Sequence, residues 1–297
     1  MSFEQVAFQH GPLRFTGLAQ GSGPVVLCMH GFPDNARSYR LQLPALAKAG
    51  YRAVSVHLRG YEPGSIPADG DYSSQAIATD VLSILDQLGE ERVHLVGHDW
   101  GAIHGYRIAA LAPERFNSLT TLTIPHMGRF VTEAGKYPKQ LALSWYVFFF
   151  QLRGISERVV ARKHYRFIRM LWRRWSPGWE PPEEELLAVI DTLSQQGVTR
   201  AALGHYREVL GPHAFPLTAA AKKKAIYQVP VPTLVMTGER DGCVDSGVCQ
   251  SLMYEEDFPG GLTVRQIAKA GHFPHQEQSE AVNTILLEWL AQNDNRT

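Results

Sequence analysis

Short runs of apolar and β-branched residues recur in the first third of the chain, bounded by glycine or proline. Three of them span residues 25–30, 51–57 and 92–97, and such runs are typical of strands buried on both faces. Between them, residues 36–49 and 74–88 place apolar side chains three and four positions apart, which predicts helices. This alternation predicts an α/β fold, with a mostly parallel central sheet and helices on both faces.

The pattern changes near residue 126 and returns near residue 229. Residues 137–179 are aromatic and basic, and residues 183–210 predict two further helices. Strand and helix patterns then resume in the order 229–238, 246–255, 262–268 and 279–292. We therefore predict a discontinuous core domain and an inserted helical cap, formed respectively by residues 1–126 with 226–297, and by residues 127–225.

The overall composition excludes some classes of partner. The 297 residues include 29 basic and 29 acidic side chains, so no long-range field attracts nucleic acid or an anionic membrane. No run approaches the roughly 20 apolar residues needed to cross a bilayer. The three cysteines form no CxxC pair and suit a reducing compartment. We expect a soluble, cytoplasmic protein that binds no nucleic acid and inserts into no membrane, and a homodimer is left open.

A basic stripe in the cap allows two interpretations. Six basic residues lie among apolar ones, namely Arg162, Lys163, Arg166, Arg169, Arg173 and Arg174. Such a stripe could bind a membrane surface. The solvated face of an amphipathic helix shows the same pattern and requires no lipid, so we expect a solvated face.

The first candidate for chemistry is Asp99, in the segment VGHDWG at residues 96–101. This segment joins an apolar strand to a helical stretch, and small residues on both sides allow a sharp turn that presents the Asp99 side chain. A nucleophile elbow of this kind usually carries serine, whereas this chain carries a carboxylate. Because an aspartate after a strand is also a common helix N-cap, this segment alone supports either role.

Two further residues follow predicted strands in the order that a catalytic triad requires. Asp241 and His272 each come after one of the strands predicted in the second part of the core. The order of Asp99, Asp241 and His272 matches nucleophile, acid and base, each at the carboxyl end of a strand. Asp245 is the competing acid, but it begins the next predicted helix and fits an N-cap.

A fourth element, HGFPD at residues 30–34, directly follows the first buried strand. The backbone N–H of Phe32, together with that of Trp100, would form an oxyanion hole, and Gly31 would permit the close approach. The His-Gly pair alone is weak support. A strand before it and an elbow after it strengthen the assignment.

Together these segments resemble the α/β-hydrolase superfamily, and within it the branch of epoxide hydrolases and haloalkane dehalogenases. The resemblance covers nearly the whole chain and rests on HGFPD, RGY, GHDWG, GERD and GHFPHQE. It implies the α/β-hydrolase fold with a helical cap, a triad of Asp99, Asp241 and His272, and oxyanion donors at Phe32 and Trp100. A carboxylate nucleophile attacks a saturated carbon and forms an alkyl ester, which water activated by the histidine then hydrolyses.

The cap decides between an epoxide and a halide as substrate. An opening epoxide leaves a basic alkoxide that needs a proton donor, whereas a halide needs only N–H donors. In epoxide hydrolases two cap tyrosines donate, and their surroundings resemble those of Tyr146 in WYVFFFQ and Tyr206 in GHYR. A tyrosine in an aromatic helix is otherwise commonly a packing residue. The resemblance therefore implies epoxide hydrolysis with Tyr146 and Tyr206, and with Tyr165, Tyr137 and His205 as fallback donors.

Two other functions stay open. A haloalkane dehalogenase would use the same nucleophile with Trp145 as a halide donor, although Phe32 stands where dehalogenases commonly carry asparagine. Fluoroacetate dehalogenases carry arginines after the nucleophile, where this chain has Trp100 and Ile103, so that branch is disfavoured. A non-catalytic ligand-binding protein could share the fold but need not keep nucleophile, acid and base.

The aromatic residues near these motifs predict a largely apolar pocket, which suits a hydrophobic alkyl or aryl epoxide. We expect the substrate to contact Phe32, Trp100, Trp145, Phe149 and Phe273. The sequence shows neither a metal-ligand spacing nor a nucleotide-binding loop, so no metal or cofactor is implied. The expected partners are the epoxide and water.

A few positions depart from the family pattern. Gly242 and Cys243 replace a Pro-Val pair that often follows the acid, and Arg153 stands where proline is frequent. No basic residue adjoins Cys243 in the sequence to lower its pKa, so we interpret this cysteine as structural or incidental. His275 and Glu277 either orient the histidine base or cap the final helix.

Overall fold

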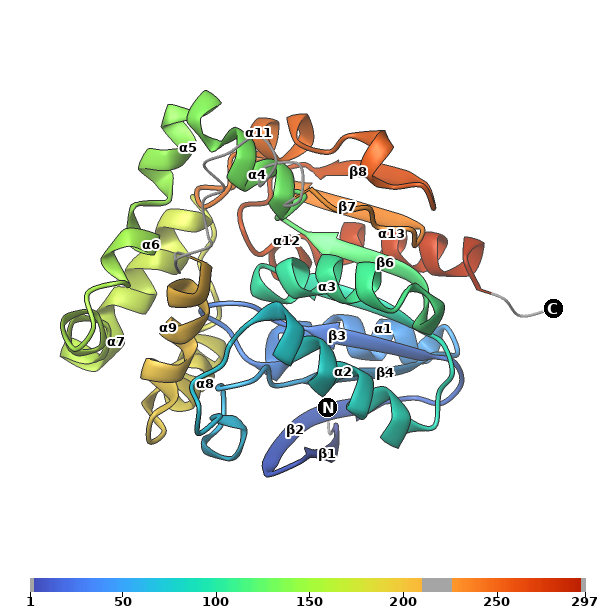
Figure 1. Cartoon of the computed structure of the whole chain (residues 1–297), viewed down its shortest axis with the longest axis horizontal. Helices are drawn as coiled ribbons and strands as arrows, with labels where there is room; N and C mark the ends of the chain where they lie inside the picture. The colour runs from blue at the N-terminus through green and yellow to red at the C-terminus, as the bar shows by residue number, and fades with distance from the viewer. Residues whose placement is uncertain (1–2, 210–225, 295–297) are drawn as a thin grey trace.

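The computed structural model describes residues 3–209 and 226–294, which include an eight-stranded sheet (Figure 1). Its strand order is β1-β2-β4-β3-β5-β6-β7-β8. The pairs β1/β2 and β2/β4 are antiparallel, and all other neighbours are parallel, so the mostly parallel sheet predicted from the sequence is confirmed. The strands are β1 (Glu4–His10), β2 (Leu13–Gln20), β3 (Val25–Met29), β4 (Arg52–Val56), β5 (Val93–His98), β6 (Phe116–Leu122), β7 (Thr233–Gly238) and β8 (Leu262–Ile267).

Helices cover both faces of this sheet. Along β3, Val26 and Cys28 pack in one hydrophobic layer with α1 and α13, whereas Leu27 and Met29 pack in the other layer with α2 and α3 (Figure 1). Successive side chains of a strand point to opposite faces, so a strand covered on both sides is apolar at every position. The helices of the core are α1 (Gln42–Lys48), α2 (Ser74–Leu88), α3 (Trp100–Leu111), α11 (Ser246–Ser251), α12 (Pro274–Glu277) and α13 (Ser279–Gln292).

The chain between β6 and β7 forms six further helices in its described part, and most of them lie at one end of the sheet, on the left of Figure 1. They are α4 (Met127–Glu133), α5 (Pro138–Leu143), α6 (Trp145–Phe149), α7 (Ile155–Trp175), α8 (Glu183–Ser194) and α9 (Val198–Val209). We call this group the cap. Residues 210–225 of the predicted cap lie outside the described residues, and the domain boundaries stay a prediction.

Most elements expected from the sequence are present, but two predicted helices have other bounds and three strands were not predicted. The helix predicted over residues 36–49 is split into a 3₁₀ turn, Ala36–Tyr39, and helix α1. Pro44 lies in the first turn of α1, where its ring would clash with the carbonyl of Arg40 in a continuous helix. The helix predicted to residue 255 ends at Ser251. Strands β1, β2 and β6 had no counterpart among the predictions.

The cap helix that carries the basic stripe is not continuous. Helix α7 is interrupted at residues 162–165, where Lys163, His164 and Tyr165 have positive φ. The Tyr165 hydroxyl donates to the Leu193 carbonyl at 3.0 Å, which ties the break to the last turn of α8. One basic residue of the stripe, Arg169, forms two 2.6 Å hydrogen bonds with Glu183 of α8.

No helix among residues 3–209 and 226–294 combines the length and the hydrophobicity that crossing a bilayer would require.

Candidate active site

Asp99 occupies a strained turn between β5 and α3. Its φ of +50° lies in a region that residues other than glycine rarely adopt. The turn passes close to β3, because a Cβ atom at Gly101 would stand 2.0 Å from the Met29 carbonyl oxygen. Asp99 holds the N-cap position of α3, yet its side chain makes no capping hydrogen bond. The carboxylate is therefore available at the carboxyl end of β5.

Backbone donors and a histidine surround the Asp99 carboxylate. Its Oδ1 accepts the Phe32 N–H at 2.8 Å, and its Oδ2 lies 3.6 Å from His272 Nε2. Gly31 permits this approach, since a Cβ there would stand 2.4 Å from Asp99 Oδ1. Burial alone would raise the pKa of Asp99, but His272 and the Phe32 N–H lower it below its ordinary value. Asp99 is therefore an anion at neutral pH.

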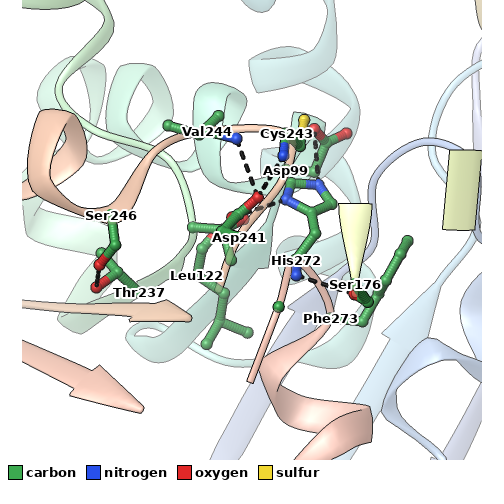
Figure 2. A network of polar contacts seen from close by, with 12 residues as sticks. Asp99, Leu122, Ser176, Thr237, Asp241, Cys243, Val244, Ser246, His272 and Phe273 are labelled. Carbon is green, nitrogen blue, oxygen red and sulfur yellow. Dashed lines mark hydrogen bonds and ion pairs between the residues drawn. The ribbon is translucent and has the colours of Figure 1, made fainter. Parts of the chain in front are cut away.

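The predicted triad residues come together at the ends of β5, β7 and β8. Figure 2 shows the His272 ring between Asp241 and Asp99, with Nδ1 at 3.0 Å from Asp241 Oδ2. Burial lowers the pKa of His272, but neighbouring Cys243 and the carboxylates of Asp241 and Asp99 together raise it well above its ordinary value. Asp245 instead caps α11 by accepting backbone N–H groups at 3.0 and 3.2 Å. The histidine thus contacts the acid that the sequence favoured.

Hydrogen bonds fix the loop that carries His272. Glu277 accepts the N–H groups of Gly271 at 2.6 Å and Phe273 at 2.9 Å, so it clamps the backbone on both sides of the histidine. The His272 N–H donates to Ser176 Oγ at 3.0 Å (Figure 2). The Ser176 hydroxyl in turn donates to Glu277. Of the two roles considered for Glu277, the geometry therefore favours orienting the histidine.

Two buried groups among the described residues each offer three potential metal ligands. One group is Asp34, His98 and His275, which lies behind the histidine base. In it, Ser38 lies 2.8 Å from His275 Nε2 and donates to Asp34. The other group consists of Asp99, Cys243 and His272.

Both predicted tyrosines face the same cavity as Asp99. This cavity has a volume of about 110 Å³, and Tyr146 of α6, Tyr206 of α9 and Asp99 all line it. The Tyr146 hydroxyl lies 3.1 Å from Cys243 Sγ, whereas the Tyr206 hydroxyl has no hydrogen-bond partner in the described part of the chain. Burial raises the pKa of both tyrosines well above the ordinary value. Both hydroxyls therefore keep their protons at neutral pH.

The fallback donors are engaged elsewhere. Besides the contact of Tyr165 with α8, the Tyr137 hydroxyl pairs with Ser251 at 3.0 Å. His205 is fully buried and lies with Nε2 at 3.0 Å from the Arg59 carbonyl. None of these three residues lines the cavity that contains Asp99.

The expected substrate contacts are only partly placed on this cavity. Trp100 lines it, but Phe32, Trp145, Phe149 and Phe273 do not. Helical periodicity explains part of the difference, because residues four apart share a face. Trp145 and Phe149 pack together against Phe167, while the next pair, Tyr146 and Phe150, faces Tyr206. The cavity lining also includes Ile103, Ile124, Pro125, Met127, Phe130, Val131, Leu141, Val147, Phe148, Val209 and Val244.

The predicted oxyanion donors lie beside the nucleophile. The Phe32 N–H already contacts the Asp99 carboxylate. Trp100 is the first residue of α3, where a backbone N–H has no partner within the helix. The roles of both donors, and of the triad, stay predictions.

Cys243 lies closer to the candidate triad than its sequence neighbours indicated. The interpretation as structural or incidental rested on the absence of a basic neighbour in the sequence, but folding brings the thiol beside the His272 imidazole. Burial raises the pKa of Cys243, and His272 only partly opposes this. The one available signal was its position two residues after Asp241, where the chain turns over that carboxylate.

Comparison with known proteins agrees with this geometry. The profile of the alpha/beta hydrolase fold family matches residues 24–278. The chain therefore belongs to the α/β-hydrolase fold family, as the motifs predicted.

Within this family the chain is similar to epoxide hydrolases. It is 30% identical over 294 residues to human epoxide hydrolase 4, covering 96% of this chain and 78% of the relative. It is also 30% identical over 289 residues to epoxide hydrolase 3 of Xenopus tropicalis, covering 95% and 76%. The solved structure of an epoxide hydrolase from an endophytic Streptomyces shares the fold with a TM-score of 0.82 at 26% identity, covering 99% of this chain and 96% of that one.

Proposed function

We propose that this protein hydrolyses epoxides to vicinal diols through a covalent ester on Asp99. The observation that carries the proposal is a single apolar cavity lined by an anionic carboxylate and by two protonated tyrosines. Opening an epoxide needs both a nucleophile at carbon and a proton donor at oxygen. The epoxide hydrolase names of the relatives support the same reaction.

In the first step, Asp99 attacks an epoxide carbon through its carboxylate. The new bond joins the carboxylate oxygen to that carbon, and the ring C–O bond breaks. The departing oxygen takes a proton from Tyr146 or Tyr206, so no free alkoxide forms. The Phe32 N–H holds Asp99 Oδ1, which leaves Oδ2 as the oxygen nearer His272.

In the second step, His272 activates water against the ester. Ester formation removes the negative charge of Asp99, which is one of the groups that raise the pKa of His272. The imidazole can then take a proton from water, while Asp241 stabilises the resulting cation. Hydroxide adds to the ester carbonyl, and negative charge develops on an oxygen that faces the Phe32 N–H. On collapse the departing ester oxygen takes the proton from the His272 cation, which releases the diol. The proton left on the Asp99 carboxyl returns to the tyrosinate, so the carboxylate, the phenol and the neutral imidazole are restored.

Trapping the ester tests this mechanism directly. In the His272→Gln variant, incubation with styrene oxide should raise the intact-protein mass by one molecule of epoxide, because the base for the second step is missing. The Asp99→Ala, His272→Gln double variant is the matched control and should gain no mass. Absence of a covalent adduct in the single variant would contradict the mechanism.

The substrate class follows from the cavity. Its walls are almost entirely aliphatic and aromatic, and the volume is about 110 Å³, so a compact hydrophobic epoxide fits better than a polar one. A parallel assay with 1-bromobutane separates the remaining alternatives. Release of halide without diol would identify a dehalogenase, and neither product would indicate a binding protein.

The free thiols also support a proposal about the cellular compartment of this protein. Cys28, Cys243 and Cys249 are all unpaired and buried, which suits a reducing compartment such as the cytoplasm. We keep the domains proposed from the sequence, in which the core and the cap together form the active site of this protein.

A further inference from the structure

A buried thiol lies in the catalytic group although the proposed reaction does not use it. Cys243 Sγ, a ring nitrogen of His272 and an oxygen of Asp99 lie within 4.8 Å of one another, and all three residues are buried. Figure 2 shows the sulfur next to the Asp99 carboxylate and above the His272 ring. Sulfur, nitrogen and oxygen donors converge here on one point.

The position of Cys243 is fixed from both sides. Its backbone N–H donates to Asp241 Oδ1 at 2.7 Å, and that of Val244 donates to the same oxygen at 3.0 Å. The Cys243 carbonyl accepts the Gln140 side-chain amide at 2.9 Å. The turn over Asp241 therefore holds the Cys243 backbone in place before any ligand arrives.

His272 is oriented as a metal-binding histidine would be. Its Nδ1 pairs with Asp241 Oδ2 at 3.0 Å, and histidines that bind metal commonly donate one ring N–H to a carboxylate in this way. The other nitrogen, Nε2, is buried and has no hydrogen-bond partner in the described part of the chain. It is directed toward Asp99 Oδ2 at 3.6 Å.

We propose that Asp99, Cys243 and His272 form an inhibitory site for a thiophilic divalent cation such as Zn²⁺. In a tetrahedral zinc site, bonds of about 2.0–2.3 Å place neighbouring ligand atoms about 3.3–3.7 Å apart, and the 3.6 Å between Nε2 and Oδ2 meets this condition. Water would fill the fourth position. The thiol proton and the proton on His272 Nε2 both pass to solvent as the Zn–S and Zn–N bonds form, since zinc binds a thiolate and a neutral imidazole.

Binding at this point would stop both chemical steps. The cation would engage the Asp99 carboxylate that attacks the epoxide and the His272 nitrogen that activates water. Mg²⁺ and Ca²⁺ prefer oxygen ligands, so the sulfur and nitrogen donors favour Zn²⁺ over these cations. This inference goes beyond the proposed function, because epoxide hydrolysis requires no metal. It can also be tested separately, since metal binding can be measured without turnover.

The decisive measurement is metal binding to the purified full chain. Titration calorimetry with ZnCl₂ should show one tight site per chain, and CoCl₂ should produce a thiolate-to-cobalt charge-transfer absorption. Cys243→Ala should weaken zinc binding at least about 100-fold and abolish that absorption, because the sulfur ligand is lost. Cys249→Ala is the matched control, since it removes another buried thiol outside the group and should leave both signals intact.

Inhibition provides the second readout. Zn²⁺ should inhibit diol formation by the unaltered protein at the concentration at which it binds, and MgCl₂ at the same concentration should not. Equal zinc affinity in Cys243→Ala, cobalt binding without the sulfur absorption, or zinc binding without inhibition would each overturn the proposal. If no diol forms under any condition, the binding titration still decides the metal site while the proposed function fails.

Discussion

The core and the cap contribute chemically different groups to one cavity, and they hold them by different means. The charged groups, Asp99, Asp241 and His272, follow strands and are fixed by hydrogen bonds from the backbone and from one another. The cap contributes neutral phenols, and the Tyr206 hydroxyl has no partner among the described residues. Buried charges are costly unless they are paired, whereas a phenol can be held by its ring.

Aromatic packing supplies the positioning in the cap. The Tyr206 ring lies 4.8 Å from Trp100, 4.9 Å from Phe150 and 5.3 Å from Phe32, measured between ring centroids. The contacts with Trp100 and Phe32 are edge-to-face and the contact with Phe150 is tilted, and such packing restricts a ring without using its hydroxyl. The difference teaches that the core stabilises its charged groups before the substrate arrives. The cap instead holds the Tyr206 hydroxyl without a hydrogen-bond partner in residues 3–209 and 226–294, so this hydroxyl is free to donate to the substrate.

The largest expected effect is removal of the nucleophile from the core. Asp99→Ala should reduce diol formation by at least about 10,000-fold, because no other group in the cavity can form the ester. Asp245→Ala is the matched control. It removes a helix cap worth about 1 kcal/mol of stability and should leave turnover of the folded protein within about twofold. Steady-state diol assays on both variants check this, and residual turnover by Asp99→Ala would contradict the assignment.

Removal of the donors from the cap should act on the first step only. Tyr146→Phe with Tyr206→Phe should slow ester formation about 1,000-fold, since the epoxide oxygen would leave without a proton. The ring packing would persist. Tyr165→Phe serves as control because its hydroxyl contacts the Leu193 carbonyl. Single-turnover kinetics measure the step, and an undiminished rate in the double variant would favour the dehalogenase.

The junction between the two regions can be weakened through Trp172. Its buried ring packs at a tilt against Phe273, and its Nε1–H donates to the Pro33 carbonyl at 2.9 Å. Trp172→Ala should lower the free energy of unfolding by about 3–5 kcal/mol. Trp172→Phe keeps much of the packing and should cost about 1–2 kcal/mol for the lost hydrogen bond. Urea unfolding separates the two contributions, and equal losses would mean that packing contributes little.

The smallest expected effect is the pH dependence of the free energy of unfolding, and it arises from His205 where the cap contacts the core. Burial lowers the pKa of His205 in the folded state to about 4, and its ring contacts His104 at 3.2 Å and the Arg59 carbonyl. Between about pH 6.5 and 4 the unfolded chain binds a proton that the folded chain does not, so stability falls as pH falls.

From pH 7 to pH 5 this single histidine should remove about 2 kcal/mol from the free energy of unfolding. Other buried histidines, including His98 with a pKa lowered to about 3, act in the same direction. His205→Gln should therefore reduce the difference between pH 7 and pH 5 by about 2 kcal/mol. The exposed His164, changed to glutamine, is the control. An unchanged difference in His205→Gln would show that this proton is not linked to unfolding.

Local patterns were sufficient for much of the fold. Helices α2 and α13 begin and end where apolar periodicity placed them, because each buries one face along its whole length. Strand β1 was not predicted, because its side chains are mostly exposed at the edge of the sheet and it therefore lacks a continuous apolar run. The break in α7 was not predicted for another reason. It is accompanied by a hydrogen bond from Tyr165 to the carbonyl of Leu193, a contact between residues that are distant in the sequence.

The candidate site shows the same division. Motif order was enough to bring Asp99, Asp241 and His272 to one edge of the sheet, although their catalytic roles stay predictions. The position of Phe149 could not be predicted, because Phe149 and Phe150 are both apolar. Only the rotation of this segment decides that Phe150 faces Tyr206 while Phe149 packs against Trp145. Glu277 had two candidate roles until the Gly271 and Phe273 N–H groups were seen to point at it.

The sequence by itself determined where strands end and which side chains follow them, because turns, caps and apolar runs are encoded by neighbouring residues. Only the tertiary structure decided that the Cys243 thiol meets the His272 imidazole and the Tyr146 hydroxyl. Those contacts join β7, β8 and the cap, which are far apart along the chain. Their distances depend on how packed elements fit together, and no local pattern specifies that fit.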